Sequence, residues 1–182
     1  MMICHALLPC IVVGALACRA SGSGSGGTSG TSGSHATQEP RDVSDELRQL
    51  TSHPDLEVVI RTGLQHWRAG EITLAVRGNG AATVTQRLAT GDTSFTATLD
   101  KDEVDALGRD LDAHRFTAAR TSKLPRKPGD TPVRFVLQRG DHRAFEAQIW
   151  NADRFDDADL DAILSAGQRL VWRVSNGAIG GP

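Results

Sequence analysis

The stretch "EITLAVRGNGAATVTQRLA", residues 71–89, sets the fold class, because its apolar side chains alternate with mostly polar ones around a glycine-rich break. Ile72, Leu74 and Val76 occupy every second position before the break. A period of two residues predicts a β-strand with one buried face. The sequence "GNG" at 78–80 favours a tight turn, since Gly and Asn tolerate positive φ. The stretch therefore predicts two antiparallel strands joined as a hairpin.

The same period continues on both sides of this hairpin. One strand is predicted over 56–62 and another over 93–99, which together with the hairpin gives a four-stranded antiparallel meander. Two more strands are predicted over 132–138 and 142–150, with a turn at 140–141 between them. The side chains expected to face the core are Leu56, Val58, Ile60, Phe95, Ala97, Leu99, Val133, Phe135, Leu137, Phe145, Ala147 and Ile149.

Helical spacing replaces strand spacing over residues 99–116. Asp100 is a candidate N-cap, and Glu103 three residues later completes a capping-box pattern. A second helix is predicted to start near Asp156 or Asp157, and a short one over 41–52, capped by Ser44. The apolar stripes of the two longer helices are Val104, Leu107 and Leu111 in the first, and Leu160, Ile163, Leu164, Val171 and Val174 in the second.

The order of these elements, ββββαββα, predicts an α+β domain. Two helices are expected to pack on one face of an antiparallel sheet of about six strands. The chain of 182 residues has room for one such domain with appendages. Its net charge of −2 argues against a nucleic-acid partner.

All three cysteines, Cys4, Cys10 and Cys18, lie in the first tenth of the chain. The predicted domain over 41–182 therefore contains no disulfide, thiol nucleophile or thiolate metal site. Residues 6–17 form an uncharged, apolar stretch of twelve, shorter than the about 20 residues that a membrane-spanning helix needs. This stretch is typical of the apolar part of an export signal.

The residues that follow this stretch are rich in Ser and Gly. Residues 19–40 have almost no apolar content and cannot fold alone. As a flexible coil they would span roughly 25 Å on average. We expect a tether that holds the domain away from whatever the N-terminus is attached to.

The sequence Ala15-Leu16-Ala17-Cys18 resembles the lipobox of bacterial lipoproteins. The resemblance implies a signal peptide over 1–17, lipid attachment at Cys18, and a disordered tether from 18 to 40. It also implies a partner in membrane lipid and a place in the cell envelope. Arg19, where an Asp would favour the inner membrane, points to the outer membrane if there is one. An apolar core segment with an incidental cysteine is the alternative interpretation.

The predicted domain resembles small domains of secreted bacterial lipoproteins, and also emfourin-type inhibitors of thermolysin-like peptidases. The matching pieces are "VIRTG" at 59–63, "LDKDEVDALGRDL" at 99–111 and "PGDTPVRFVL" at 128–137. The resemblance implies an α+β fold and, as an alternative function, inhibition of a metallopeptidase.

Catalytic motifs are missing from the sequence: it has no Gly-x-Ser-x-Gly, Ser-x-x-Lys, His-Glu-x-x-His or phosphate-binding loop. We therefore expect a binding module without a cofactor rather than an enzyme. An enzyme of another type would need His66, His114 or His142 beside carboxylates in a deep pocket.

The loop "GLQHWRAG", residues 63–70, is the leading candidate for partner contact. Glycines bracket Trp67 and Arg68, and Trp and Arg are enriched among the residues that anchor interfaces. The two side chains are therefore predicted contact residues for a protein partner that the sequence does not identify. The competing interpretation is a tryptophan packed over the sheet edge.

Three further patterns have simpler explanations. Asp110 and His114 are spaced to share a metal, but two ligands do not make a site, and we expect no metal there. The acidic run 151–161 lacks the glycine of a calcium loop, and helix capping explains its carboxylates. The basic segment 120–130 either contacts anionic lipid or is a solvated loop.

Overall fold

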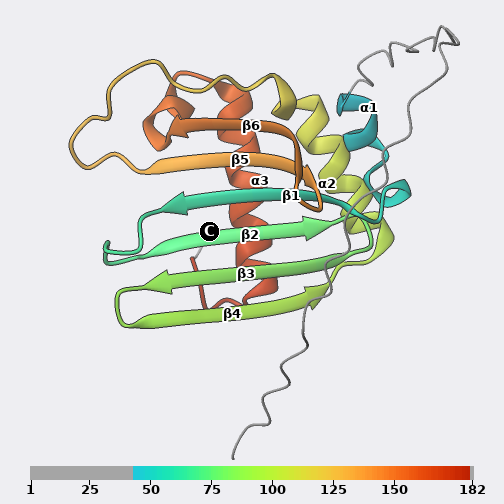
Figure 1. The fold of residues 1–182 in the computed structure, drawn as a ribbon, viewed down its shortest axis with the longest axis horizontal. Helices are drawn as coiled ribbons and strands as arrows, with labels where there is room; N and C mark the ends of the chain where they lie inside the picture. The colour runs from blue at the N-terminus through green and yellow to red at the C-terminus, as the bar shows by residue number, and fades with distance from the viewer. Residues whose placement is uncertain (1–42, 181–182) are drawn as a thin grey trace, which may run out of the picture. The chain divides into compact units, whose positions relative to one another are not determined.

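The computed structural model describes residues 43–180, which form one antiparallel sheet of six strands with helices on one face (Figure 1). The α+β fold class is therefore confirmed. The predicted signal peptide, Cys18 and the tether lie outside the described residues. The strands are β1 Leu56–Gly63, β2 Glu71–Arg77, β3 Ala81–Leu88, β4 Gly91–Thr98, β5 Pro132–Arg139 and β6 His142–Trp150.

The strand order in the sheet is β4-β3-β2-β1-β5-β6. The first four strands form the predicted meander. β5 joins the sheet beside β1, antiparallel, with Val59 opposite Val136. This crossover places β5 and β6 on the far side of β1, so that the two edge strands are β4 and β6.

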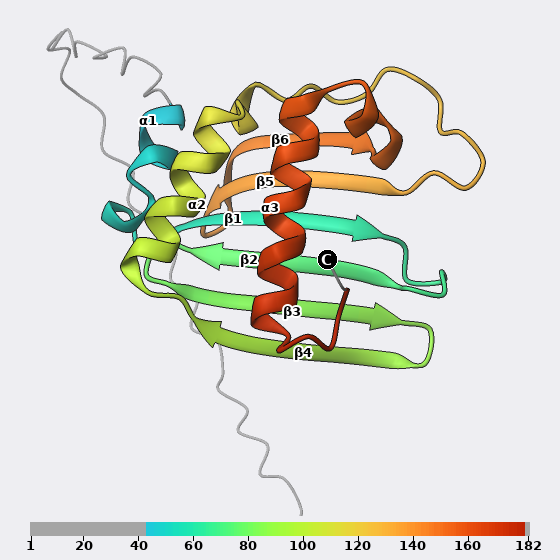
Figure 2. The same ribbon diagram turned by 180° about the vertical axis from the view of Figure 1, so that it is seen from behind.

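Three α-helices occur among the described residues: α1 Val43–Arg48, α2 Lys101–Ala113 and α3 Ala158–Val174. Three short 3-10 helices accompany them: η1 Leu50–Ser52, η2 Phe116–Ala118 and η3 Asn151–Phe155. Figure 2 shows α2 and α3 crossing the same face of the sheet. No helix in this part of the chain is long and apolar enough to cross a bilayer.

The helix starts follow the sequence with one exception. Asp100 caps α2: the Glu103 backbone N–H donates to its side chain at 2.8 Å, and the Glu103 carboxylate accepts from the Asp100 N–H at 3.0 Å. Asp157 caps α3. The prediction for Ser44 is wrong, because Ser44 lies inside α1 and its hydroxyl donates to the Asp112 carboxylate of α2.

The core lies between the helices and the sheet, and the predicted inward side chains form it. Five of them are partly buried and the others are buried; the five are Ile72, Phe95, Ala97, Phe145 and Val171. The opposite face of the sheet carries no described helix (Figure 1). Ion pairs cover it instead, as between Arg77 and Glu57 at 2.9 Å.

Candidate functional site

Two loops that the sequence singles out separately meet at one end of the sheet. The β1–β2 loop over 64–70 lies at one end of the sheet, and the segment 119–131 runs along β6 and then reaches the same end before β5 begins (Figure 1). The guanidinium carbon of Arg126 lies 4.8 Å from the centre of the Trp67 ring, within the range of a cation–π contact. We call this region the loop end of the sheet.

The β1–β2 loop is a compact structure rather than a free coil. Trp67 N–H donates to the Leu64 carbonyl at 2.9 Å, and Gly70 N–H donates to the Trp67 carbonyl at 2.9 Å. Gly63 has φ +86°, and a Cβ there would lie 2.3 Å from the carbonyl oxygen of Gly70. The Gln86 side chain of β3 donates to the Ala69 carbonyl at 2.9 Å. These contacts hold Trp67 in a fixed position.

The facing segment is held by hydrogen bonds to β6 and to its own turn. The indole N–H of Trp150 donates to the Leu124 carbonyl at 2.9 Å. Arg126 Nε donates to the Asp130 carbonyl at 2.9 Å, and the Asp130 carboxylate accepts from the Thr131 N–H at 2.8 Å. Arg126 therefore reaches Trp67 from an ordered backbone.

The cations at this end are largely uncompensated. Among the described residues, the exposed side chains of Arg68, Lys123 and Lys127 have neither an ion pair nor a hydrogen bond. Trp67 is partly buried, with Arg126 on its ring and His66 at its edge. Trp67 thus packs against side chains of the two loops, while Arg68 remains available for contact.

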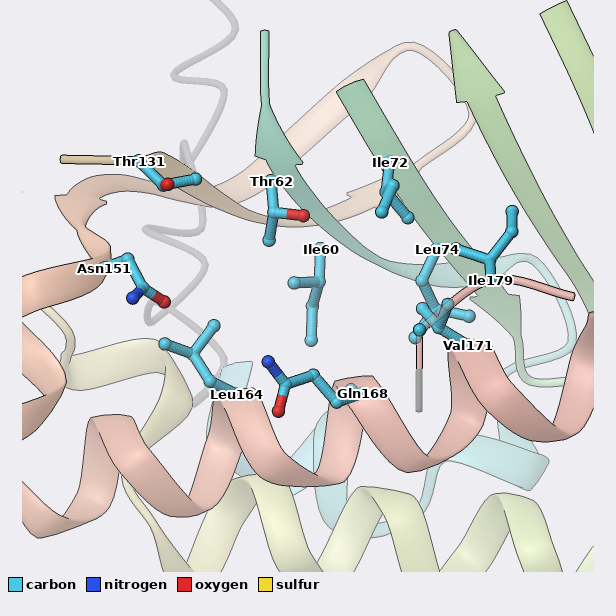
Figure 3. A pocket seen from close by; sticks show the side chains of 12 residues that line it. Ile60, Thr62, Ile72, Leu74, Thr131, Asn151, Leu164, Gln168, Val171 and Ile179 are labelled. Carbon is cyan, nitrogen blue, oxygen red and sulfur yellow. The ribbon is translucent and has the colours of Figure 1, made fainter. Parts of the chain in front are cut away.

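A pocket of about 250 Å³ lies between α3 and strands β1 and β2 (Figure 3). Thr62 and Ile72, on either side of the 63–70 loop, line its wall, so the pocket lies close to the loop end. None of the described residues that line it has a charged side chain. The apolar lining residues are Ile60, Ile72, Leu74, Leu164, Val171 and Ile179.

Four neutral polar side chains complete the lining of the pocket: Thr62, Thr131, Asn151 and Gln168. Within the described part of the chain, these four side chains have no hydrogen-bond partner. An apolar cleft with a few polar groups is the usual form of a site for a small ligand or an inserted side chain. The pocket therefore extends the loop end inward.

Asp110 and His114, which are spaced to share a metal, have different partners in the structure. Asp110 faces Arg169 at 3.9 Å, whereas His114 Nδ1 lies 3.2 Å from the carboxylate of Asp159 at the start of α3. Arg115 donates to the same carboxylate at 2.6 and 2.8 Å. Hydrogen bonds from Arg115 and then His114 hold the pKa of Asp159 below its usual range.

This cluster lies in a groove of about 610 Å³ that Asp153, Asp156 and Asp157 also line. Arg115 has φ +52°, a left-handed conformation at the end of α2, and its ion pair with Asp159 ties α2 to α3. Of the three candidate histidines, His114 alone contacts a carboxylate among residues 43–180, and Arg115 already neutralises that carboxylate. His66 contacts Trp67, and His142 is exposed.

Helix capping accounts for part of the acidic run 151–161. Asp157 accepts from Asp159 N–H at 2.9 Å, Asp153 accepts from Trp150 N–H at 2.9 Å, and Asp161 pairs with Arg154. No group of three or more His, Cys, Asp or Glu side chains in the described range is arranged to hold a metal.

Two contacts were not predicted from the sequence: that of Arg126 with Trp67 and that of His114 with Asp159. Each joins residues more than forty positions apart, and local patterns carry no information on such pairs. No known family matches this chain, and no curated protein is significantly similar to it. The roles of the residues at the loop end are therefore assigned from their geometry and chemistry alone.

Proposed function

We propose that this chain is a lipid-anchored, extracytoplasmic binding module that takes a protein partner at the loop end of its sheet. Cys18 carries the anchor in this proposal, on the strength of the sequence Ala15-Leu16-Ala17-Cys18. The thiolate is a good nucleophile for lipid attachment. Several acyl chains on one residue hold a protein to a membrane far more firmly than one.

The contact between Arg126 and Trp67 is the observation that carries the binding proposal. It joins two loops into one surface, on which an aromatic ring lies beside exposed cations. A preorganised Trp costs little entropy on binding, and Trp and Arg dominate the energetics of interfaces. Because Arg68, Lys123 and Lys127 are unpaired in the described residues, a partner that presents carboxylates fits this surface.

Crosslinking in the native envelope tests the binding proposal. Wild-type protein is expected to give a defined crosslinked partner, and Trp67→Ala and Arg68→Ala to lose most of it. Arg109→Ala is the matched control, because Arg109 is an exposed arginine of α2 at the other end of the sheet. If Trp67→Ala and Arg68→Ala captured the partner as well as Arg109→Ala does, a contact at the loop end would be contradicted.

The anchor is tested separately. Mass spectrometry of the native protein is expected to show a chain that begins at a lipid-modified Cys18, and Cys18→Ala is expected to leave the membrane fraction. A free thiol at Cys18 with an uncut leader would refute the anchor without affecting the binding proposal.

A further inference from the structure

The two edges of the sheet differ in how they are protected from other chains. An edge strand presents unpaired backbone groups, and proteins usually cover or charge such an edge. β6 is covered: Ser122 N–H donates to the Gln148 carbonyl at 2.8 Å, and Gln148 N–H donates to the Thr121 hydroxyl at 3.2 Å. β6 also has a register irregularity opposite Leu137 and Gln138 and an ion-paired Glu146.

Among the described residues β4 has neither such a cover nor such an irregularity, and its one charged residue, Asp92, pairs with Arg87 at 3.4 Å near the start of the strand. Figures 1 and 2 show it as the outermost strand, with no described segment along its outer side. Residues 93–99, "TSFTATL", contain no charge and no proline. The strand is regular along its whole length, since it pairs with β3 from Ala81–Thr98 to Leu88–Gly91 without interruption.

The direction of the backbone groups of β4 follows from its contact with the preceding turn. Leu99 N–H donates to the Gly80 carbonyl at 2.9 Å, toward β3. Backbone groups alternate in direction along a strand, so those of Asp92, Ser94, Thr96 and Thr98 point away from β3. Within residues 43–180 no hydrogen bond satisfies these outward groups.

We infer that β4 pairs antiparallel with β4 of a second copy of this chain. A twofold axis at Phe95 places Ser94 opposite Thr96 and Asp92 opposite Thr98, with each such pair exchanging backbone hydrogen bonds. An axis at Thr96 would instead oppose Asp92 with Asp100, and like charges opposite each other are unfavourable. The register centred on Phe95 therefore gives the longest overlap without repulsion.

Side chains support the same register. Phe95 lies on the helix side and is only partly buried against the core. At the axis it meets Phe95 of the second copy directly across the strand pair, and aromatic cross-strand pairs are stabilising. The result is one continuous sheet through both copies. The loop ends remain outside the contact, so this inference does not rest on the proposed function.

Light scattering on the full chain in detergent, corrected for the micelle, tests the pairing. We expect the mass to rise toward two chains as protein concentration increases to about 1 mM. Thr96→Pro removes an outward N–H and is expected to abolish this rise, because the bonds to β3 do not use that group. Thr96→Ala keeps the N–H and is the matched control, expected to behave as wild type.

Hydrogen exchange gives a second measurement that does not depend on a variant that folds. The amides of Ser94, Thr96 and Thr98 are expected to exchange at least tenfold more slowly at high than at low concentration. The amides of Phe95 and Ala97, bonded within the sheet, serve as internal controls. A constant monomer mass would overturn the inference, as would protection of the outward amides that is independent of concentration, since another part of the chain would then cover β4.

Discussion

The end of the sheet beneath α1 and α2 and the loop end use their side chains in opposite ways. At the helical end, Leu47 and Leu50 are completely buried, and a Cβ on Gly78 would lie 2.2 Å from the Leu50 carbonyl oxygen. At the loop end, Leu124 is 63% exposed.

Hydrogen bonds follow the same division. Thr51 donates to Asp105 at 2.6 Å and Arg48 to Asp112 at 2.5 Å, so that α1 and the adjoining 3-10 turn are tied to α2. At the loop end, Arg68, Lys123 and Lys127 have no such partners among the described residues. Rigid scaffolds commonly carry recognition on loops at one end, and here the helical end supplies the stability that leaves the loop end free for contact.

Truncation of a leucine at each end is expected to give the largest difference in the free energy of unfolding. Leu50→Ala removes a fully buried side chain and should lower the free energy of unfolding by about 2–5 kcal/mol. Leu124→Ala removes an exposed one and should change it by less than about 0.5 kcal/mol. Urea denaturation measures both, and equal losses would show that the two ends do not differ in packing.

A glycine inside α2 tests how closely the helical end is packed. Ala is the better helix former by about 0.8–1.0 kcal/mol, yet a Cβ on Gly108 would lie 2.4 Å from the Leu47 carbonyl oxygen. We expect Gly108→Ala to destabilise the protein by about 1–3 kcal/mol.

Gly167→Ala in α3 is the control for this prediction. Its Cβ would meet only the side chain of Ile60, with Cδ1 at 3.1 Å and Cγ2 at 3.9 Å, so the loss of stability should be small in comparison. Thermal unfolding reports both variants. A Gly108→Ala protein more stable than wild type would mean that α1 can move away from α2 at little cost in free energy.

The carboxylate of Asp112 is expected to make the stability of the helical end depend on pH. Burial raises its pKa, but hydrogen bonds from Ser44 and Arg48 outweigh burial and lower the pKa overall. A lowered folded-state pKa means that ionised Asp112 stabilises the fold above its unfolded pKa of about 3.9. This contribution is lost as pH falls through the folded pKa.

Asp112→Asn should therefore be less stable than wild type at neutral pH, by about 1 kcal/mol. The difference should shrink as the pH falls below about 4. Denaturation at a series of pH values measures it. The exposed Asp110, as Asp110→Asn, is the control and should show little change. A difference that is constant with pH would rule out the charge of Asp112 as its cause.

Arg126→Ala at the loop end is expected to have the smallest effect on stability. An exposed cation–π contact contributes about 0.5–1 kcal/mol. The free energy of unfolding should therefore fall by less than about 1 kcal/mol. The indole N–H resonance of Trp67 should nevertheless shift and broaden, because its ring loses the covering guanidinium. Lys127→Ala removes a neighbouring cation without this contact. An unchanged Trp67 signal in Arg126→Ala would argue that the two loops are independent.

Local elements and the faces they bury could be predicted from the sequence. Period-two patterns such as Ile72, Leu74 and Val76 identified the strands and the face that each one buries. The Asp100 and Glu103 spacing located the start of α2. These predictions succeeded because side-chain alternation and helix capping depend on residues within a few positions of each other. The candidate residues Trp67 and Arg68 were also found locally, as an aromatic and a cation between two glycines.

Contacts between distant segments could not be predicted in this way and are seen only in the folded chain. β5 lies beside β1 in the sheet, although three strands and α2 separate the two in the chain. Arg126 likewise contacts Trp67 from a loop some sixty residues later in the chain. One sequence signal for the first pairing exists: Val59 and Val136 interrupt the polar face of their strands, and they lie opposite each other. A local pattern shows which face of its strand a residue occupies. Which residue of another element it contacts depends on the packing of the whole core, because its burial depends on every element that packs there.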